Sequence, residues 1–249
     1  MRREVKKSLD VLHDTGLMAA SQDYAQGGTQ LPAAVAQMCV GLLKGAKVGT
    51  QSYAGLTIAA ANLIVAQGSE HQQEKYAELM MVGRFFGTMC LTEPHAGSSL
   101  GNLRTRAVPR EDGSYRLFGN KIHISGGDHE PSENIIHMVL ARLSDAPPGV
   151  KGISLFIVPK VRIEDDRSLG DRNDVALSGF IHKMGYCGTT CTMLNFGEKD
   201  GAAGYLVGEP NNGLAAINAK KVPATWKRPW RIRPFIWKLS AIQSSAGCG

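Results

Sequence analysis

The sequence is 249 residues long and 43% hydrophobic, which is enough apolar material for one large domain or two smaller ones. It has no run of about 18 apolar residues, and its charged start, residues 1–7, lacks the apolar core of a signal peptide, so we expect no membrane span and a cytoplasmic location. The formal charge is +6, but seven of the 28 basic residues and none of the 22 acidic ones lie beyond residue 218, so the rest of the chain is near neutral and gives no nucleic-acid-binding surface.

The first part of the chain, residues 1–84, is predicted to be a helical domain. Apolar residues recur at helical spacing, and Gly68 separates two of the segments. Ser69 and Gln72 have the spacing of a capping box, which predicts a helix start at Glu70. The expected helices are one with Val5, Leu9 and Leu12 on its face, then Leu31–Leu43, Val48–Ala66 and Glu70–Met81.

The middle part, residues 85–209, is predicted to be a β domain. Its apolar runs are short, rich in β-branched or aromatic residues, and separated by Gly, Pro, Asp and Asn. Many strands without helices between them favour an antiparallel barrel or sandwich, and hence an α+β fold class for the chain. The expected strands are Phe85–Leu91, Thr105–Arg110, Tyr115–Phe118, Lys121–Ser125, Ile135–Arg142, Ser154–Val158, Gly179–Met184, Cys191–Phe196 and Tyr205–Val207.

The last part, residues 210–249, begins like a helix at Leu214–Ile217 and then changes composition. From residue 219 on it holds all three tryptophans, three prolines at helix-breaking spacing and no carboxylate side chain. We interpret residues 210–249 as the start of a C-terminal helical domain followed by an aberrant basic tail. A premature, out-of-frame ending explains these features together.

The cysteines and the histidine-rich segment give no sign of a metal site or a disulfide framework. The five cysteines are odd in number, without framework spacing, which is typical of reduced thiols. One cluster has metal-ligand residue types, but a strand that leads into a polar turn explains it, so we expect no metal. The residues concerned are Cys39, Cys90, Cys187, Cys191 and Cys248, and then His123, Asp128, His129 and Glu130.

The most informative segment is Met89–Ser99, MCLTEPHAGSS, where a strand runs into a loop with Pro, Gly and small hydroxyl residues. Such a loop exposes backbone N–H groups at the mouth of a β domain. These groups can hold the polar edge of a flat ring, or a pyrophosphate, without steric hindrance. The segment therefore predicts a cofactor-binding loop.

Four segments in order resemble the acyl-CoA dehydrogenase family over residues 5–217. The first is T-E-P-x-A-G-S after an apolar strand, and the second is Lys121–Gly127, similar to the family's K-x-W-I-T-N-G strand. The later two are Lys183–Gly185 with its following threonines and Leu206–Gly213. Within the family, the strings GTMCLTEPHAGSS and DAPPGVKGISLFIVP are similar to the subgroup that includes methylthiopropanoyl-CoA dehydrogenases.

The resemblance implies an FAD-dependent enzyme that removes an α-proton and a β-hydride from an acyl-CoA thioester and passes the hydride to FAD. It implies an electron-transfer flavoprotein as acceptor and a homo-oligomer. It places the isoalloxazine contacts in the first loop, the pyrophosphate near its glycine, the acyl-CoA chain near Ser98, and further flavin contacts in the second strand. The implied cofactor-binding residues are Met89, Leu91, Thr92, Gly97, Ser98, His123, Ile124 and Ser125.

Three positions depart from the family pattern. His123 stands where an aromatic residue, commonly Trp, shields the flavin, which predicts a shifted redox potential or a weaker fit of the ring. Ser125 replaces Thr and keeps the hydroxyl, and Ser99 stands where Asp is common. Glu93, inside the motif, is interpreted as a brace for the loop.

The catalytic base is the main discrepancy. In the family it is a glutamate of the C-terminal helical domain, and proton abstraction needs a carboxylate within hydrogen-bond reach of the α-carbon. No residue of this chain takes that role by the resemblance, so we expect an inactive, C-terminally truncated chain whose helical bundle is missing. Two alternatives are a non-catalytic flavin- or acyl-CoA-binding remnant and nucleic-acid binding through the basic, Trp-containing tail, which the neutral body disfavours.

Overall fold

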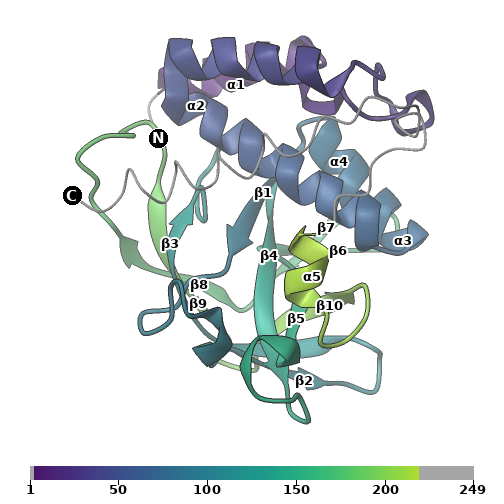
Figure 1. Cartoon of the computed structure of the whole chain (residues 1–249), viewed down its shortest axis with the longest axis vertical. Helices are drawn as coiled ribbons and strands as arrows, with labels where there is room; N and C mark the ends of the chain where they lie inside the picture. The colour runs from purple at the N-terminus through teal and green to yellow at the C-terminus, as the bar shows by residue number, and fades with distance from the viewer. Residues whose placement is uncertain (1–2, 219–249) are drawn as a thin grey trace. The chain divides into compact units, whose positions relative to one another are not determined.

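The computed structural model describes residues 3–218, and the predicted basic tail, residues 219–249 with Cys248, lies outside the described residues. A helical part comes first, a strand-rich part follows, and α2 packs against β1 (Figure 1). The expected α+β order of elements is confirmed. The domain limits 1–84, 85–209 and 210–249 stay a prediction, because one core cluster is shared by the helices and the strands.

The helical part contains two long helices, followed by a shorter run that starts at the predicted cap. Ser69 Oγ accepts the N–H of Gln72 and the Gln72 side chain accepts the N–H of Ser69, so the capping box is confirmed. The bounds are α1 Arg3–Asp14, α2 Ala33–Gln67, α3 Glu70–Gln72, η3 Gln73–Ala77, α4 Glu78–Met81 and, after the strands, α5 Gly213–Asn218. Short 3-10 turns lie at Leu17–Ala19, Tyr24–Gln26, Leu100–Asn102 and Gly149–Gly152. No helix within residues 3–218 is long and apolar enough to cross a membrane.

Helix α2 is kinked at Lys47, where φ is −158° and ψ is 83°. The kink falls between the two helices that the sequence predicts. At this point the loop before β9 approaches the helix so closely that a Cβ on Gly49 would lie 2.8 Å from the Cα of Gly188. The hydroxyl of Thr189 donates to the Gly49 carbonyl at 2.8 Å, and the Tyr53 hydroxyl accepts the N–H of Thr190 at 3.0 Å. The bend is therefore fixed by a tertiary contact.

The strands form one eight-stranded sheet and a separate two-stranded ribbon. Strand order in the sheet is β1-β4-β5-β10-β3-β9-β8, and β2 pairs with both β3 and β4, so β4, β5, β10, β3 and β2 close a ring. The bounds are β1 Phe85–Cys90, β2 Arg106–Pro109, β3 Tyr115–Ser125, β4 Asn134–Leu143, β5 Ile153–Pro159, β6 Val161–Ile163, β7 Leu169–Arg172, β8 Val175–Phe180, β9 Cys191–Phe196 and β10 Ala202–Val207. The expected barrel is confirmed, but two pairs, β1–β4 and β2–β4, are parallel. The connections between these strands are long enough for parallel pairing.

Three of the predicted strands are wrong in their limits. The strand expected at Gly179–Met184 ends at Phe180, and Met184 is 95% exposed, outside any ladder. The strands expected on either side of Gly119 are one strand, because the missing Cβ of Gly119 lets β3 pass Thr105, whose Oγ1 would lie 2.4 Å from that Cβ. The short pair β6–β7 had no sequence signal.

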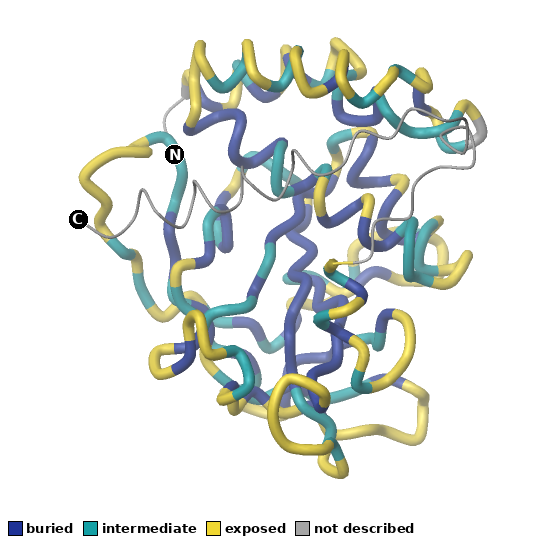
Figure 2. The backbone as a smooth tube through the Cα atoms, in the orientation of Figure 1, coloured by how far each residue is buried: buried dark blue, intermediate teal, exposed yellow. Residues whose placement is uncertain are grey.

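The core has two compartments that share the strands β4 and β5. Alternate residues of these strands, such as Ile136 and Leu155, face the helices, while Val139 and Phe156 face the barrel interior. A strand that is buried on both faces has a continuous run of apolar residues, which explains the sequences of β4 and β5. Figure 2 shows these two strands buried, whereas much of the surface of α1 and of the first half of α2 is exposed.

Two histidines are enclosed in this core. His137 points into the barrel, where its Nδ1 lies 2.8 Å from Thr88 Oγ1, and its side chain is fully buried. His129 packs against the stacked rings of Tyr53 and Phe86, edge-on to Tyr53. Burial lowers the pKa of His129 to about 4 and that of His137 to about 3. Both imidazoles are therefore neutral in the folded protein at neutral pH.

Because the unfolded histidines titrate near pH 6.5, the stability that their neutral burial allows is present above that pH and is lost below it. We expect the free energy of unfolding to fall by about 3 kcal/mol between pH 7.5 and 5.5 from the two together, since each contributes about 1.4 kcal/mol per pH unit below 6.5. Urea unfolding at several pH values measures this. His137→Gln halves the slope, and His182→Gln, at an exposed site, leaves it unchanged. A flat profile would contradict the assignment.

Candidate functional site

The loop that follows β1 folds back on itself and leaves its tip exposed. The N–H groups of Glu93 and Ala96 each donate to the carbonyl of the other, at 2.9 and 3.0 Å, and Ala96 is buried. The next three residues, Gly97, Ser98 and Ser99, are exposed. Within residues 3–218, their backbone N–H groups donate to no protein acceptor. The loop therefore presents consecutive free N–H donors.

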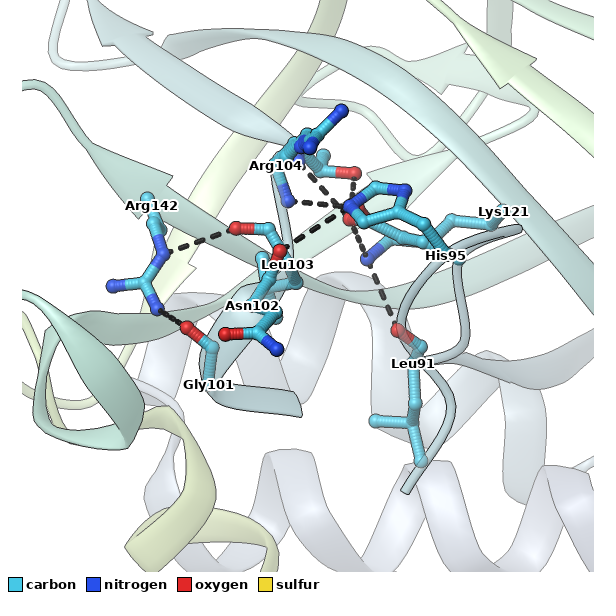
Figure 3. Close-up of polar contacts among 10 residues, drawn as sticks. Leu91, His95, Gly101, Asn102, Leu103, Arg104, Lys121 and Arg142 are labelled. Atoms are coloured by element: carbon cyan, nitrogen blue, oxygen red, sulfur yellow. Dashed lines mark hydrogen bonds and ion pairs between the residues drawn. The ribbon is translucent and has the colours of Figure 1, made fainter. Parts of the chain in front are cut away.

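Glu93 anchors this loop from below and is almost fully buried. Its carboxylate accepts the N–H groups of Arg104 and Thr105 at 2.7 and 3.0 Å and the Thr105 hydroxyl at 2.5 Å (Figure 3). It also accepts the ammonium of Lys121 at 2.9 Å, and the two side chains are 2% and 0% exposed. Four donors thus join the loop to the start of β2 and to the middle of β3. The interpretation of Glu93 as a loop brace agrees with this geometry.

The pKa of Glu93 is decided by two opposed effects. Burial raises it, and the ammonium of Lys121 with the hydrogen bonds from Thr105 and Arg104 more than reverses that effect, so the pKa lies below its ordinary value. Glu93 is therefore an ionised carboxylate at neutral pH, held in place by four donors. Because it is committed to these contacts, Glu93 is not a candidate base.

A second set of contacts fixes the chain between the loop and β2. The Arg142 guanidinium donates to the carbonyls of Gly101 and Leu103 at 2.5 and 3.1 Å (Figure 3). It also donates to the carbonyls of Pro147 and Gly149 at 3.1 and 2.7 Å. His95 Nε2 lies 3.2 Å from the Asn102 carbonyl oxygen. The segment after the exposed tip is consequently held at several points rather than free to close over the site.

The second predicted site segment, on β3, lies directly beside the loop. The N–H of Ile122 donates to the Thr92 carbonyl at 3.0 Å, and Lys121 Nζ donates to the Leu91 carbonyl at 3.2 Å. The β3–β9 register shifts between Lys121 and Ile124, and His123 at this bulge has a φ of +57° and is exposed. A bulge turns a side chain out of the regular alternation, which explains why His123 faces outward.

The predicted cofactor-binding residues therefore come together, but they do not all present side chains. Met89 and Leu91 are partly buried against the helical core, and Thr92 and Ser125 are partly exposed. Ile124 is 1% exposed and faces the barrel interior, so only its backbone can reach a ligand. The assignment of these eight residues to a cofactor stays a prediction.

A cavity of about 220 Å³ lies beside the loop, and none of the predicted site residues lines it. Its walls come from the brace and its surroundings, namely Glu93, Pro94, His95, Arg104, Thr105, Gly119 and Asn120. The sequence did not single out Arg104 or Arg142. The signal available for Arg142 was its charged side chain at the end of the apolar run of β4.

Comparison with known proteins agrees with this arrangement. Residues 88–198, from β1 to the end of β9, match the family model described as acyl-CoA dehydrogenase, middle domain. The chain is 39% identical over 209 residues to 3-methylmercaptopropionyl-CoA dehydrogenase of Ruegeria pomeroyi, an alignment that covers 84% of this chain and 35% of that protein. The chain thus spans about a third of the length of this curated relative.

Two solved structures share the fold. Butyryl-CoA dehydrogenase from Megasphaera elsdenii superimposes with a TM-score of 0.68 at 25% identity, over 84% of this chain and 51% of that one. An acyl-CoA dehydrogenase complexed with FAD from Bacillus anthracis does so with a TM-score of 0.69 at 24% identity, over 85% and 34%. The helices followed by a strand-rich barrel are the acyl-CoA dehydrogenase fold. The chain belongs to the acyl-CoA dehydrogenase family.

Replacement of Glu93 by Gln removes the charge that Lys121 needs and leaves a buried ammonium without its counter-ion. We expect Glu93→Gln to lower the free energy of unfolding by about 3–5 kcal/mol, the usual cost of breaking a buried pair on one side. Chemical denaturation at pH 7 measures this effect.

The matched control is Glu133→Gln, which breaks the exposed pair of Glu133 with Arg84, whose side chains are 47% and 45% exposed. An exposed ion pair contributes less than about 1 kcal/mol, so this variant should unfold almost as the parent does. Equal losses in the two variants would contradict the bracing role of Glu93.

Proposed function

We propose that this chain binds FAD on the exposed loop after β1 and the bulged segment of β3, as part of an acyl-CoA dehydrogenase. FAD bound there supplies a hydride acceptor for α,β-dehydrogenation of an acyl-CoA thioester to a trans-2-enoyl-CoA. The observation that carries the proposal is the row of N–H groups at Gly97–Ser99 that have no acceptor within residues 3–218. They belong to the loop whose Thr92 carbonyl accepts the N–H of Ile122 on β3. The family membership supports it.

The residues present fit this cofactor. Free backbone N–H groups in an exposed loop form a concave site for phosphate oxygens. Gly97 has open space where a side chain would lie, since the nearest atom to a Cβ there is Thr92 Cγ2 at 3.9 Å. A pyrophosphate can therefore approach the backbone closely. On β3, His123 offers a flat side chain and Ser125 a hydroxyl at the surface that faces the ring.

The chain's own residues bind and orient the cofactor but supply no base among residues 3–218 that the geometry identifies. Glu93 is saturated by four donors, and no Asp or Glu occurs from residue 219 on. We therefore propose flavin binding without turnover for the 249-residue chain, a non-catalytic binding role. Acyl-CoA is the proposed ligand near Ser98, and an electron-transfer flavoprotein is the proposed acceptor for the whole enzyme.

For the acyl group, the name of the Ruegeria relative supports the subgroup that the loop strings resemble, the methylthiopropanoyl-CoA dehydrogenases. A test is to titrate the purified chain with FAD and then to add methylthiopropanoyl-CoA with an artificial electron acceptor. The expected result is a bound-flavin spectrum and no enoyl-CoA. Absence of FAD binding would overturn the proposal. Formation of enoyl-CoA would overturn the inference that the chain lacks a catalytic base.

Gly97→Ala tests the close approach of phosphate to the loop. The added methyl group meets no protein atom nearer than 3.9 Å, so the fold is unaffected, but it fills the space that a pyrophosphate needs. We expect FAD affinity to fall at least tenfold, or about 1.4 kcal/mol, as measured by quenching of flavin fluorescence. Gly45→Ala, which likewise adds a methyl group in open space but on α2, should leave the affinity unchanged. An unaltered affinity in Gly97→Ala would contradict the assignment of this loop.

His123→Trp tests the position that departs from the family pattern. An indole covers more of the flavin than an imidazole, and an aromatic stacking contact contributes about 0.5–1.5 kcal/mol. We expect FAD to bind roughly two- to tenfold more tightly, measured by the same titration. The control His182→Trp adds the same ring at an exposed position outside the site and should have no effect. Weaker binding in His123→Trp alone would place the flavin elsewhere.

A further inference from the structure

A groove of about 910 Å³ opens in the β region away from the loop after β1. It lies where the turn between β2 and β3, the ribbon β6–β7, the start of β8 and the turn between β9 and β10 meet. We call it the arginine groove, and its lining residues are Arg110, Arg116, Arg162, Arg172, Asn173, Asp174, Val175, Ala176, Leu177, Glu198, Lys199, Asp200 and Gly201.

The cations of the groove come from separate places in the chain. Arg116 is on β3, Arg162 on β6 and Arg172 on β7, while Arg110 and Lys199 lie in turns. Five cationic and three anionic side chains line the groove, a difference of +2. In the described part of the chain, no guanidinium of the groove lies within 4.0 Å of a carboxylate oxygen. The arginines thus make no direct ion pair within residues 3–218, although Asp112 lies close to two of them, in the turn between β2 and β3. The pKa of Asp112 is lowered by hydrogen bonds from Ser114 and further by the charges of Arg116 and Arg110.

Two of the three carboxylates are occupied by the turn between β9 and β10. Asp174 Oδ2 accepts the N–H groups of Lys199 and Gly201 at 2.8 and 3.1 Å. Glu198 Oε1 accepts the side-chain N–H of Asn195 at 2.6 Å. These carboxylates shape the rim of the groove and do not pair with its arginines. Only Asp200 has no such contact within residues 3–218.

Strand pairing places two of the arginines. Arg172 stands opposite Val161 in the ribbon, and Arg116 stands opposite Ala203 on β10. The turn fits closely over Arg116, because a Cβ on Gly201, whose φ is +93°, would lie 2.7 Å from the Arg116 Cβ. The strand pairing fixes the backbone positions of Arg116 and Arg172. These two cations therefore project from defined points of the groove wall before any ligand binds.

Like charges that converge without counter-ions raise the free energy of the folded chain, and an anion relieves this repulsion. Guanidinium groups donate two parallel hydrogen bonds to phosphate oxygens, which makes arginine the preferred side chain for this task. A single phosphate would leave most of a groove of about 910 Å³ empty. Arginines at several points of its wall require a ligand with more than one anionic group.

We propose that the arginine groove binds an oligophosphate anion, either inorganic or as the phosphate chain of a nucleotide. The groove is distinct from the proposed FAD loop. Along β3, Arg116 and His123 are 123 − 116 = 7 positions apart, which is roughly 20 Å of extended strand. The second site would therefore be filled independently of the first.

Isothermal titration of the full chain with inorganic pyrophosphate and tripolyphosphate, at fixed low salt and with or without excess FAD, tests this proposal. We expect saturable binding that FAD does not displace, with tripolyphosphate bound more tightly than pyrophosphate. Arg162→Gln combined with Arg172→Gln should weaken binding at least tenfold. Lys7→Gln with Lys44→Gln removes the same charge from the helices and should change it less than twofold.

Arg162→Lys with Arg172→Lys keeps the charge and the fold but removes the paired donors, and should lie between the parent and the glutamine variant. Thermal unfolding of each variant shows that the chain is intact. The proposal is overturned if tripolyphosphate does not saturate, if FAD displaces it, or if both charge-removing variants lose affinity equally. It is also overturned if poly-glutamate binds in the groove and tripolyphosphate does not, since the groove would then be a protein-docking surface. Adenosine triphosphate bound more tightly than tripolyphosphate would support a nucleotide source within the same chemistry.

Discussion

The buried ion pair of Glu93 and Lys121 is the interaction on which the site depends. Both side chains are almost fully shielded from solvent, and each provides the opposite charge that the other lacks. The pair joins the exit of β1, the start of β2 and the centre of β3, which are separate in sequence and become neighbours through one carboxylate. A buried pair of this kind adds little net stability over a well-packed apolar replacement. Its value is that it allows one geometry for the loop.

That geometry decides what the loop can do. The inner half of the loop is committed to the brace. The outer half, Gly97–Ser99, is exposed, and its N–H groups have no acceptor in the part of the chain that the structure describes. The same division explains why Glu93, although the central carboxylate of the motif, is unsuited to proton transfer. In the function proposed above, residues 3–218 therefore bind the cofactor, and Glu93 takes no part in proton abstraction.

Local signals in the sequence were reliable where the structure is local. The cap at Ser69 and the bounds of β9 depend on neighbours a few residues away, and both were predictable. The loop was recognisable as a site from its Pro, Gly and hydroxyl residues, and Glu93 as its brace. The sequence did not show that Lys121 is the partner of Glu93, because the two residues are 28 positions apart and a lysine within a strand is usually solvated.

Other errors have the same origin. The strand expected at Gly179–Met184 rests on apolar composition. Composition does not reveal that the pairing of β8 with β9 ends at Phe180 and leaves Met184 exposed. The outward turn of His123 depends on a bulge, and the inward side chain of Ile124 follows from it. The alternation of apolar and polar residues along a strand predicts neither of these two side-chain directions. The parallel pairing of β1 with β4 is likewise a property of the whole sheet.

The kink of α2 has a consequence for the order in which the chain acquires its structure. The contact that fixes it joins Gly49 to Thr189, which are 140 positions apart. On a ribosome, the residues of α2 are synthesised before those of that loop. The contact that fixes the bend therefore cannot form until the loop before β9 has been made. Closing so long a stretch of chain costs entropy, which delays this contact relative to the hydrogen bonds within the helix itself.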